Sequence, residues 1–255
     1  MRVVKVGGRA QADPRFFRAV REAWNDSPSA VCLVHGGGDE VSAMQRELGK
    51  EATFVGGRRV TSKSDIDLLR MVLSGVVNKR LVNGLVAAGV PAVGLSGEDA
   101  ALIGAELIDA ATLGFAGRPT AVNAHLLHAL MGAGYLPVIS PVAYNAASGA
   151  DGALNVNGDD AAAAIAAALK ADELLLVADV EGVRNAQDDI VSTLTVEYAR
   201  ELTESGIAAG GMAAKLEAAH AALLGGVDRV RICDLPGLVD GERGTFITQS
   251  QSVII

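Results

Sequence analysis

The feature of this chain that most restricts its fold is the regular alternation of short β-branched runs with longer segments rich in alanine and leucine. This alternation is typical of βαβ units around a mostly parallel, buried sheet. We expect strands at residues 2–6, 30–35, 92–95, 136–139, 173–178, 229–233 and 244–248. Helices are expected at 13–25, 38–48, 63–75, 78–88, 123–133, 159–171, 195–204 and 211–224, with hairpins and loops over 96–120. The pattern predicts an α/β sandwich, divided near residue 171 into two halves that share one sheet.

Length, charge and cysteine content exclude several classes of protein. A chain of 255 residues can bury a stable core without cross-links, so Cys32 and Cys233 are expected to be buried apolar residues and not a disulfide. The formal net charge of -8 argues against nucleic acid as a partner. A membrane-spanning helix needs about 20 apolar residues in a row, and the sequence has no such run. We therefore expect a cytoplasmic protein that acts on small molecules.

Two glycine-rich turns follow the first two predicted strands. Lys5 is followed by Val6, Gly7 and Gly8, and His35 by three glycines before a helix. Exposed backbone N–H groups in such turns can cradle an anion, and a helix N-terminus adds to the attraction. Neither turn has the spacing of a P-loop or of a dinucleotide fingerprint. Two cradles at adjacent strand ends favour one polyanionic ligand between them, although each alone is compatible with an ordinary strand-to-helix turn.

Two further segments place charges near predicted helix starts. The segment 155–159 reads Asn-Val-Asn-Gly-Asp, and Lys215 lies one turn into a helix that follows Gly210 and Gly211. Taken alone, Asp159 could be only a helix cap and Lys215 only an exposed charge. Together with Lys5, these residues suit phosphoryl transfer, which needs fixed cations and N–H donors around the moving group and no covalent bond to the protein.

The combined motifs resemble the amino acid kinase family, and most closely its members that phosphorylate N-acetyl-L-glutamate in arginine biosynthesis. They occur in the family's order and approximate spacing: Lys5-x-Gly-Gly, His35-Gly-Gly-Gly, Gly57-Arg-Arg-Val-Thr, Asn78-Lys, Gly94-Leu-Ser-Gly, Asn155-Val-Asn-Gly-Asp and Gly211-Met-x-x-Lys. The resemblance implies an open αβα sandwich around a predominantly parallel sheet of about eight strands. It also implies an N-terminal lobe, residues 1–171, that binds the acyl amino acid and dimerises, and a C-terminal lobe, residues 172–255, that binds ATP.

Site residues follow from the same resemblance. Lys5 and Lys215 would stabilise the transferring phosphoryl group, and Asp159 would orient both lysines. The acceptor N-acetyl-L-glutamate would be held by the following residues: Gly37, Gly38, Arg59 and Asn155. An arginine fork suits a carboxylate, and Arg58 competes with Arg59 for this role by adjacency. A carboxylate acceptor is already ionised at pH 7, so His35 is expected to be a local hydrogen-bonding group and not a general base.

The resemblance also assigns the nucleotide site. ATP would be bound by the glycines of the first turn and by two loops of the C-terminal lobe: Gly7, Gly8, Asp179, Gly182, Val183, Ile207, Ala209, Gly211 and Met212. Magnesium would be held mainly by the ATP phosphates, with no protein metal ligand expected. Arg9 departs from the family pattern, because a small or apolar residue would be less surprising after the glycine pair, and it could alter the nucleotide contacts.

Two other functions are compatible with parts of this pattern, and the resemblance also implies an oligomeric state. One alternative is the related kinase that acts on 2-aminoadipate or glutamate attached to an acidic carrier protein, which the charge of -8 and Asn157 disfavour. An N-succinyl acceptor stays open. The other alternative is a non-catalytic ligand-binding protein, which would not need both lysines. The chain begins at its first strand, without the N-terminal helical extension that accompanies hexamers and arginine inhibition in this family, so we expect an arginine-insensitive homodimer.

Overall fold

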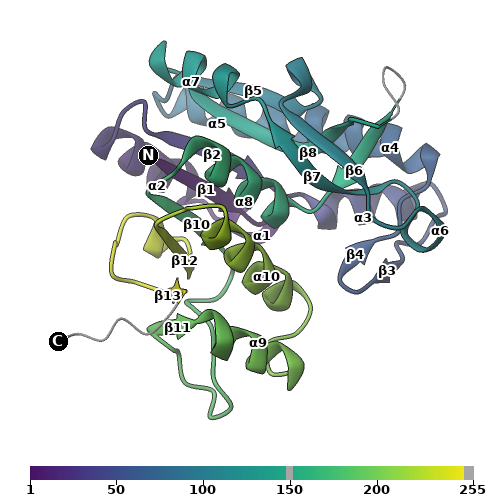
Figure 1. The fold of residues 1–255 in the computed structure, drawn as a ribbon. Coiled ribbons are helices and arrows are strands. Elements are labelled where there is room, and N and C mark those ends of the chain that lie inside the picture. The colour runs from purple at the N-terminus through teal and green to yellow at the C-terminus, as the bar shows by residue number, and fades with distance from the viewer. Residues whose placement is uncertain (148–151, 250–255) are drawn as a thin grey trace.

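In the computed structural model, which describes residues 1–147 and 152–249, a twisted central sheet is covered by helices on both faces (Figure 1). Eight strands form its main path, and the only antiparallel neighbours along this path in the described residues are β12 and β13. In spatial order they are β11 (Thr193–Thr195), β13 (Thr245–Thr248), β12 (Arg229–Cys233), β10 (Glu173–Val177), β1 (Arg2–Val6), β2 (Val31–His35), β8 (Leu136–Asn145) and β5 (Ala92–Gly97). The predicted sandwich with a predominantly parallel sheet is confirmed.

Three more strands extend the sheet beside the far half of β8, which brings the total to 11. They are β6 (Ile103–Leu107), β7 (Ala116–Val122) and β9 (Ala153–Val156). β6 and β7 pair antiparallel, with the short helix α6 (Ala110–Leu113) between them, which fits the hairpins expected over 96–120. A separate two-stranded hairpin consists of β3 (Phe54–Val55) and β4 (Arg58–Arg59). The sheet has more than the expected eight strands because β8 continues beyond the ends of β2 and β5. There it pairs with β6 and β9.

The helices divide between two apolar clusters, one on each face of the sheet. One face carries α7 (Ala124–Gly132), α8 (Gly158–Leu169), α9 (Val196–Glu204) and α10 (Gly211–Leu224). The other carries α2 (Phe16–Asp26), α3 (Gly38–Glu47), α4 (Lys63–Leu69) and α5 (Asn78–Ala87). A π-helical segment, Arg70–Val77, joins α4 to α5, so the two helices expected there form one continuous run. Alanines of α8 such as Ala162 and Ala166 are fully buried, which lets this helix pack close to the sheet and to α10.

Short elements complete the fold. The helix expected from residue 13 begins at Phe16, after the four-residue helix α1 (Gly8–Gln11), and 3₁₀ turns lie at Asp99–Ala101 and Pro236–Leu238. Cys32 and Cys233 are both free and fully buried, as expected. None of the helices described for residues 1–147 and 152–249 is long and apolar enough to cross a bilayer. Because β1 and β2 are parallel, the glycine turns that follow them emerge at the same edge of the sheet.

Candidate active site

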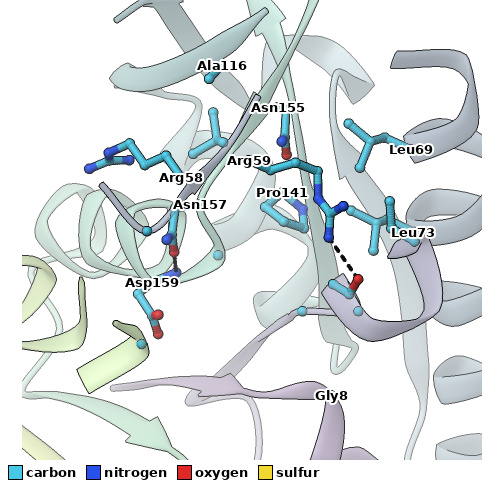
Figure 2. Close-up of a pocket in the computed structure, with 18 of the residues that line it drawn as sticks. Gly8, Arg58, Arg59, Leu69, Leu73, Ala116, Pro141, Asn155, Asn157 and Asp159 are labelled. Atoms are coloured by element: carbon cyan, nitrogen blue, oxygen red, sulfur yellow. Dashed lines mark hydrogen bonds between the residues drawn. The ribbon is translucent and has the colours of Figure 1, made fainter. Parts of the chain in front are cut away.

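A cavity of about 400 Å³ opens at this edge, between the two glycine turns, the β3–β4 hairpin and the N-terminal ends of α8 and α10 (Figure 2). Its lining includes ten of the predicted site residues: Lys5, Gly7, Gly8, Gly37, Gly38, Arg59, Asn155, Asp159, Gly211 and Lys215. These residues come from both halves of the sequence. The structure thus brings together the two predicted lysines, the two glycine turns and the predicted carboxylate-binding arginine around one hollow.

A three-residue ion cluster forms one end of the cavity. The Lys5 Nζ, at the end of β1, lies 3.0 Å from the Asp159 Oδ1, and the Lys215 Nζ of α10 lies 3.1 and 3.2 Å from the two Asp159 oxygens. Asp159 is held in the first turn of α8, where the side chain of Asn157 accepts a hydrogen bond from the Asp159 amide. One carboxylate therefore fixes two ammonium groups that lie 210 positions apart in the chain (5 and 215).

Burial and charge act against each other in this cluster. Burial by itself would raise the pKa of Asp159, but the two adjacent ammonium groups outweigh it and hold that pKa below its usual value. Burial, followed by repulsion from Lys5, lowers the pKa of Lys215, although Asp159 opposes the shift. With two cations and one anion, the cluster carries a formal excess of one positive charge. Such an excess in a partly desolvated cavity favours an anionic ligand.

Side chains pack closely against the backbone of two glycines around the cluster. A Cβ on Gly37 would lie 2.7 Å from the Leu73 Cδ2, and one on Gly158 would lie 3.2 Å from the Lys5 Cε. Gly8 and Gly38 are the first residues of α1 and α3, where a helix leaves the amides without an intrahelical partner. By contrast, the Gly7 amide donates to the Val177 carbonyl at 3.2 Å. The free donors at the cavity are therefore better sought at Gly8 and Gly38 than at Gly7.

His35 lies beneath the second glycine turn and is fully buried. Its Nδ1 lies 2.9 Å from the Gly36 carbonyl, and its Nε2 lies 3.1 Å from the Asn78 Nδ2. The ring is satisfied when Nδ1–H donates to Gly36 and Nε2 accepts from Asn78, which is a neutral imidazole. Burial lowers the pKa of His35 to about 4. The local hydrogen-bonding role expected for His35 agrees with this geometry.

The other end of the cavity presents a buried guanidinium. Arg59 is 9% exposed, its Nη1 donates to the Gln45 Oε1 at 2.6 Å, and its Nη2 donates to the Gly38 carbonyl and the Ser42 Oγ, both at 2.9 Å. The ring of Phe54 lies 4.7 Å from the Arg59 Cζ. Arg59 is therefore held rigidly, with no carboxylate hydrogen-bonded to it among the described residues. Burial is the largest influence on the pKa of the Arg59 guanidinium and lowers it.

Asn155 and two apolar side chains complete this end. The Asn155 Nδ2 donates to the Thr61 Oγ1 at 2.9 Å, which connects β9 to the segment after β4. Leu69 and Leu73 line the cavity beside Arg59 (Figure 2). The end is thus part charged and part apolar, a combination that suits a small carboxylic acid with an apolar group. Arg58, the competing candidate, extends away from Arg59 and pairs with Asp160.

Most of the predicted C-terminal nucleotide residues lie outside the cavity lining. Asp179 forms an ion pair of 2.6 Å with Arg9, Gly182 is buried against Thr245, and Val183 is a core residue whose amide donates to the Thr245 Oγ1. Farther along the chain, Ile207 and Ala209 are exposed, and Met212 packs against the apolar cluster of α8–α10. Only Gly211 of this set borders the cavity.

Several lining residues were not among the predicted site residues. Phe54, Leu69 and Leu73 have no motif of their own, and only their contact with the cavity identifies them. Asn157 and Gly158 belong to the segment 155–159, and their place in that motif is the signal that could have identified them. Over residues 1–147 and 152–249, no three His, Cys, Asp or Glu side chains are arranged to hold a metal ion.

The amino acid kinase family model matches residues 1–234. The chain therefore belongs to the amino acid kinase family, the class that the fold and the paired lysines indicate. Among curated relatives, proteins named acetylglutamate kinase are 42–44% identical to it. The protein from Methanopyrus kandleri is 43% identical over 97% of this chain and 100% of its own, and that from Chloroflexus aurantiacus 42% over 98% and 97%.

Solved structures agree on the fold. A protein from Streptococcus mutans superposes with a TM-score of 0.87 at 28% identity, covering 98% of both chains. A carbamate kinase from Giardia superposes with a TM-score of 0.72 at 15% identity, over 98% of this chain and 99% of its own. At the latter identity the similarity concerns the fold alone. The sandwich is thus shared well beyond the acetylglutamate kinases.

Proposed function

We propose that this protein is an ATP-dependent kinase that phosphorylates the γ-carboxylate of N-acetyl-L-glutamate, forming N-acetyl-L-glutamyl 5-phosphate and ADP in arginine biosynthesis. The observation that carries the proposal is the single cavity that joins the buried Arg59 to the Lys5–Asp159–Lys215 cluster. The acetylglutamate kinases at 42–44% identity support the choice of acceptor. No feature of the described residues favours a carrier-linked acceptor over this small one.

The acceptor would lie with its α-carboxylate at Arg59 and Asn155 and its γ-carboxylate toward the lysines. An arginine that is already fixed by Gln45 and Ser42 loses little freedom when it grips a carboxylate. The apolar walls at Leu69 and Leu73 can receive the acetyl methyl group. Since the γ-carboxylate is ionised at neutral pH, no proton has to be removed before it attacks.

In the transfer, a γ-carboxylate oxygen forms a bond to the γ-phosphorus of ATP while the bond to the β–γ bridging oxygen breaks, and ADP leaves with that electron pair. Negative charge spreads over the moving group, which Lys5 and Lys215 would face from different lobes. Asp159 holds both ammonium groups in place before the substrates arrive, so little reorganisation remains at the moment of reaction. The amides of Gly8, Gly37 and Gly38 would add donors around the phosphates.

ATP would extend from this cluster over the carboxyl end of β10, where Asp179, Gly182, Val183, Ile207, Ala209, Gly211 and Met212 are the proposed contacts. Bound Mg²⁺ would neutralise phosphate charge. Asp159 is engaged by two lysines and Asp179 by Arg9, so neither carboxylate is free to bind a metal, which fits a magnesium ion held mainly by the phosphates. The Arg9–Asp179 pair would have to open or adjust for Asp179 to contact the nucleotide.

A cytoplasmic homodimer is part of the same proposal. Three large apolar side chains on the helical run from α4 to α5 are more than half exposed: Met71, Val76 and Val86. Their exposure supports a buried contact between two copies, because exposed apolar surface is a common mark of an interface. Light scattering of the purified protein would give the mass of a dimer, and a concentration-independent monomer mass would contradict the dimer.

The decisive experiment is a coupled assay of ADP release with hydroxylamine trapping of the acyl phosphate. ADP and a hydroxamate should form with N-acetyl-L-glutamate and Mg-ATP, and not with free L-glutamate. N-succinyl-L-glutamate tests the acyl group in the same assay. Turnover only with a carrier-linked acceptor would replace the proposed acceptor, and ATP binding without turnover of any of them would favour a ligand-binding protein.

A further inference from the structure

Two consecutive arginines of β4 are attached to opposite walls of the cavity. The Arg59 side chain reaches α3, where Gly38, Ser42 and Gln45 receive its hydrogen bonds. The Arg58 side chain reaches the first turn of α8, where it forms an ion pair with Asp160. Figure 2 shows the two side chains extending in opposite directions from the strand, as neighbouring residues of a β-strand do. β4 is therefore tied to both sides of the hollow that it borders.

The hairpin that carries these arginines has little structure of its own. β3 and β4 have two residues each, and the turn between them contains Gly56 and Gly57, both at positive φ. A short two-stranded hairpin is marginally stable in isolation. Its base is fixed where the Thr61 amide donates to the Leu113 carbonyl. The contacts of Arg58 and Arg59 are then what holds the strand itself over the cavity.

The Arg58–Asp160 pair is shielded from solvent. The two side chains are only 26% and 16% exposed, and the pair joins residues 102 positions apart in the chain. Burial is the largest influence on the Asp160 carboxyl and raises its pKa in spite of Arg58, and Asp159 and Glu217 add further negative charge nearby. An unpaired Asp160 carboxylate would be energetically costly at this place. We therefore expect the ion pair between Arg58 and Asp160 to persist.

The same pair connects the two functional ends of the cavity. Asp160 directly follows Asp159 in α8, and Arg58 directly precedes Arg59 in β4. A bond between Arg58 and Asp160 therefore fixes the distance between the strand that presents the carboxylate-binding guanidinium and the helix turn that holds the two lysines. Arg58 borders the cavity and forms an ion pair with Asp160, whereas no carboxylate among the described residues forms an ion pair with Arg59, although Asp65 and Asp39 lie near enough to act on its charge.

We propose that Arg58 is a positioning residue for the transfer described above: through its ion pair with Asp160 it holds the β3–β4 hairpin over the cavity and keeps Arg59 aimed at the acceptor. This proposal rests on the proposed function, because it assigns a role within that reaction. Arg58 acts through Asp160 and Arg59 and does not touch the reacting atoms.

The first test measures the hairpin without any substrate. Hydrogen–deuterium exchange of the amide of Val60, which donates to the Thr53 carbonyl at 2.9 Å, reports whether the hairpin is closed. Arg58→Ala and Asp160→Asn should each raise exchange across residues 53–60 by about tenfold, and Arg58→Lys should restore part of the protection. Unchanged exchange in both variants would overturn the proposal, whatever the enzyme's acceptor proves to be.

The second test is kinetic. Arg58→Ala and Asp160→Asn should each raise the acceptor KM by about tenfold and leave the ATP KM within about twofold, and the double variant should be no worse than either single one. Arg118→Ala is the matched control, because Arg118 lines a second hollow, outside the cavity, together with Arg58 and Asp160, but pairs with Glu106 at the surface. If Asp160→Asn leaves the acceptor KM unchanged while Arg58→Ala raises it, Arg58 contacts the acceptor itself and the positioning role is wrong. Absence of turnover in the unmodified enzyme would instead count against the proposed function alone.

Discussion

The neutral, buried His35 makes the stability of the protein depend on pH in a way that a single variant can isolate. Burial lowers the pKa of His35 from about 6.5 to about 4. Between those two values the unfolded chain binds a proton at this position and the folded protein does not, so acidification favours unfolding. The full shift corresponds to about 3 kcal/mol, and about 2 kcal/mol of it is already lost at pH 5. The contribution is present in full above the unfolded value and disappears as the pH falls toward 4.

Urea unfolding at pH 7.5 and at pH 5, at fixed protein concentration, measures this loss. His35→Gln keeps an acceptor for Asn78 and removes the titration, so its free energy of unfolding should fall by about 2 kcal/mol less than that of the unmodified protein over the same interval. The other three histidines, at 125, 128 and 220, are present in both proteins and cancel. If the free energies of unfolding of the two proteins fall in parallel, the assignment of a neutral imidazole to the buried His35 is wrong. An NMR titration in which the His35 ring protonates near pH 6.5 would refute it independently.

Three further variants test the two ends of the cavity. Lys215→Ala should lower kcat by about 10²–10³-fold with little change in the acceptor KM, since in the proposed reaction its ammonium acts on charge that develops in the transition state, and an unchanged kcat would remove Lys215 from the reaction. Arg59→Ala should chiefly raise the acceptor KM, by about 30-fold or more for the loss of about 2 kcal/mol, and an unaltered KM would show that another group holds the carboxylate. Gly158→Ala should raise the unfolding temperature slightly, as alanine stiffens the unfolded chain, while kcat falls several-fold because the new methyl group displaces Lys5. A kcat equal to that of the unmodified enzyme would show that the added methyl group does not displace the Lys5 side chain.

The strands of the main sheet could be predicted because their cause is local. The segments 2–6, 31–35 and 229–233 are short and rich in Val, Ile and Leu, which favours buried strands over helices, and the structure has them within a residue of their expected limits. The expected strand stops at Ile139, short of the observed end of β8 at Asn145, because Pro141 argues against a continuing central strand and outweighs the strand preference of Val142 and Tyr144. It is pairing with β6 and β9 that makes this segment extended. The π-helical segment at Arg70–Val77 likewise has no compositional mark.

In the candidate site, too, some features could be predicted from the sequence and others could not. Lys5, Asp159 and Lys215 belong to recognisable motifs, so their juxtaposition could be expected from the resemblance to a family, although their separation in the chain hides it from any local pattern. The Arg58–Asp160 pair and the ring of Phe54 against Arg59 depend on how the hairpin folds back over α8, which no spacing in the sequence reveals. Whether Asp179 and its neighbours bind a nucleotide stays a prediction.

The central position of β1 has a consequence for how the chain is made. β1 pairs with β2, which follows within 30 residues, and on its other side with β10, where Arg2 faces Glu173. During synthesis, the edge of β1 that pairs with β10 stays unpaired until about 170 further residues of the chain have left the ribosome. An open strand edge in a nascent chain invites association with other chains. Pausing translation between these two strands should therefore lower the soluble yield far more than pausing it after β12.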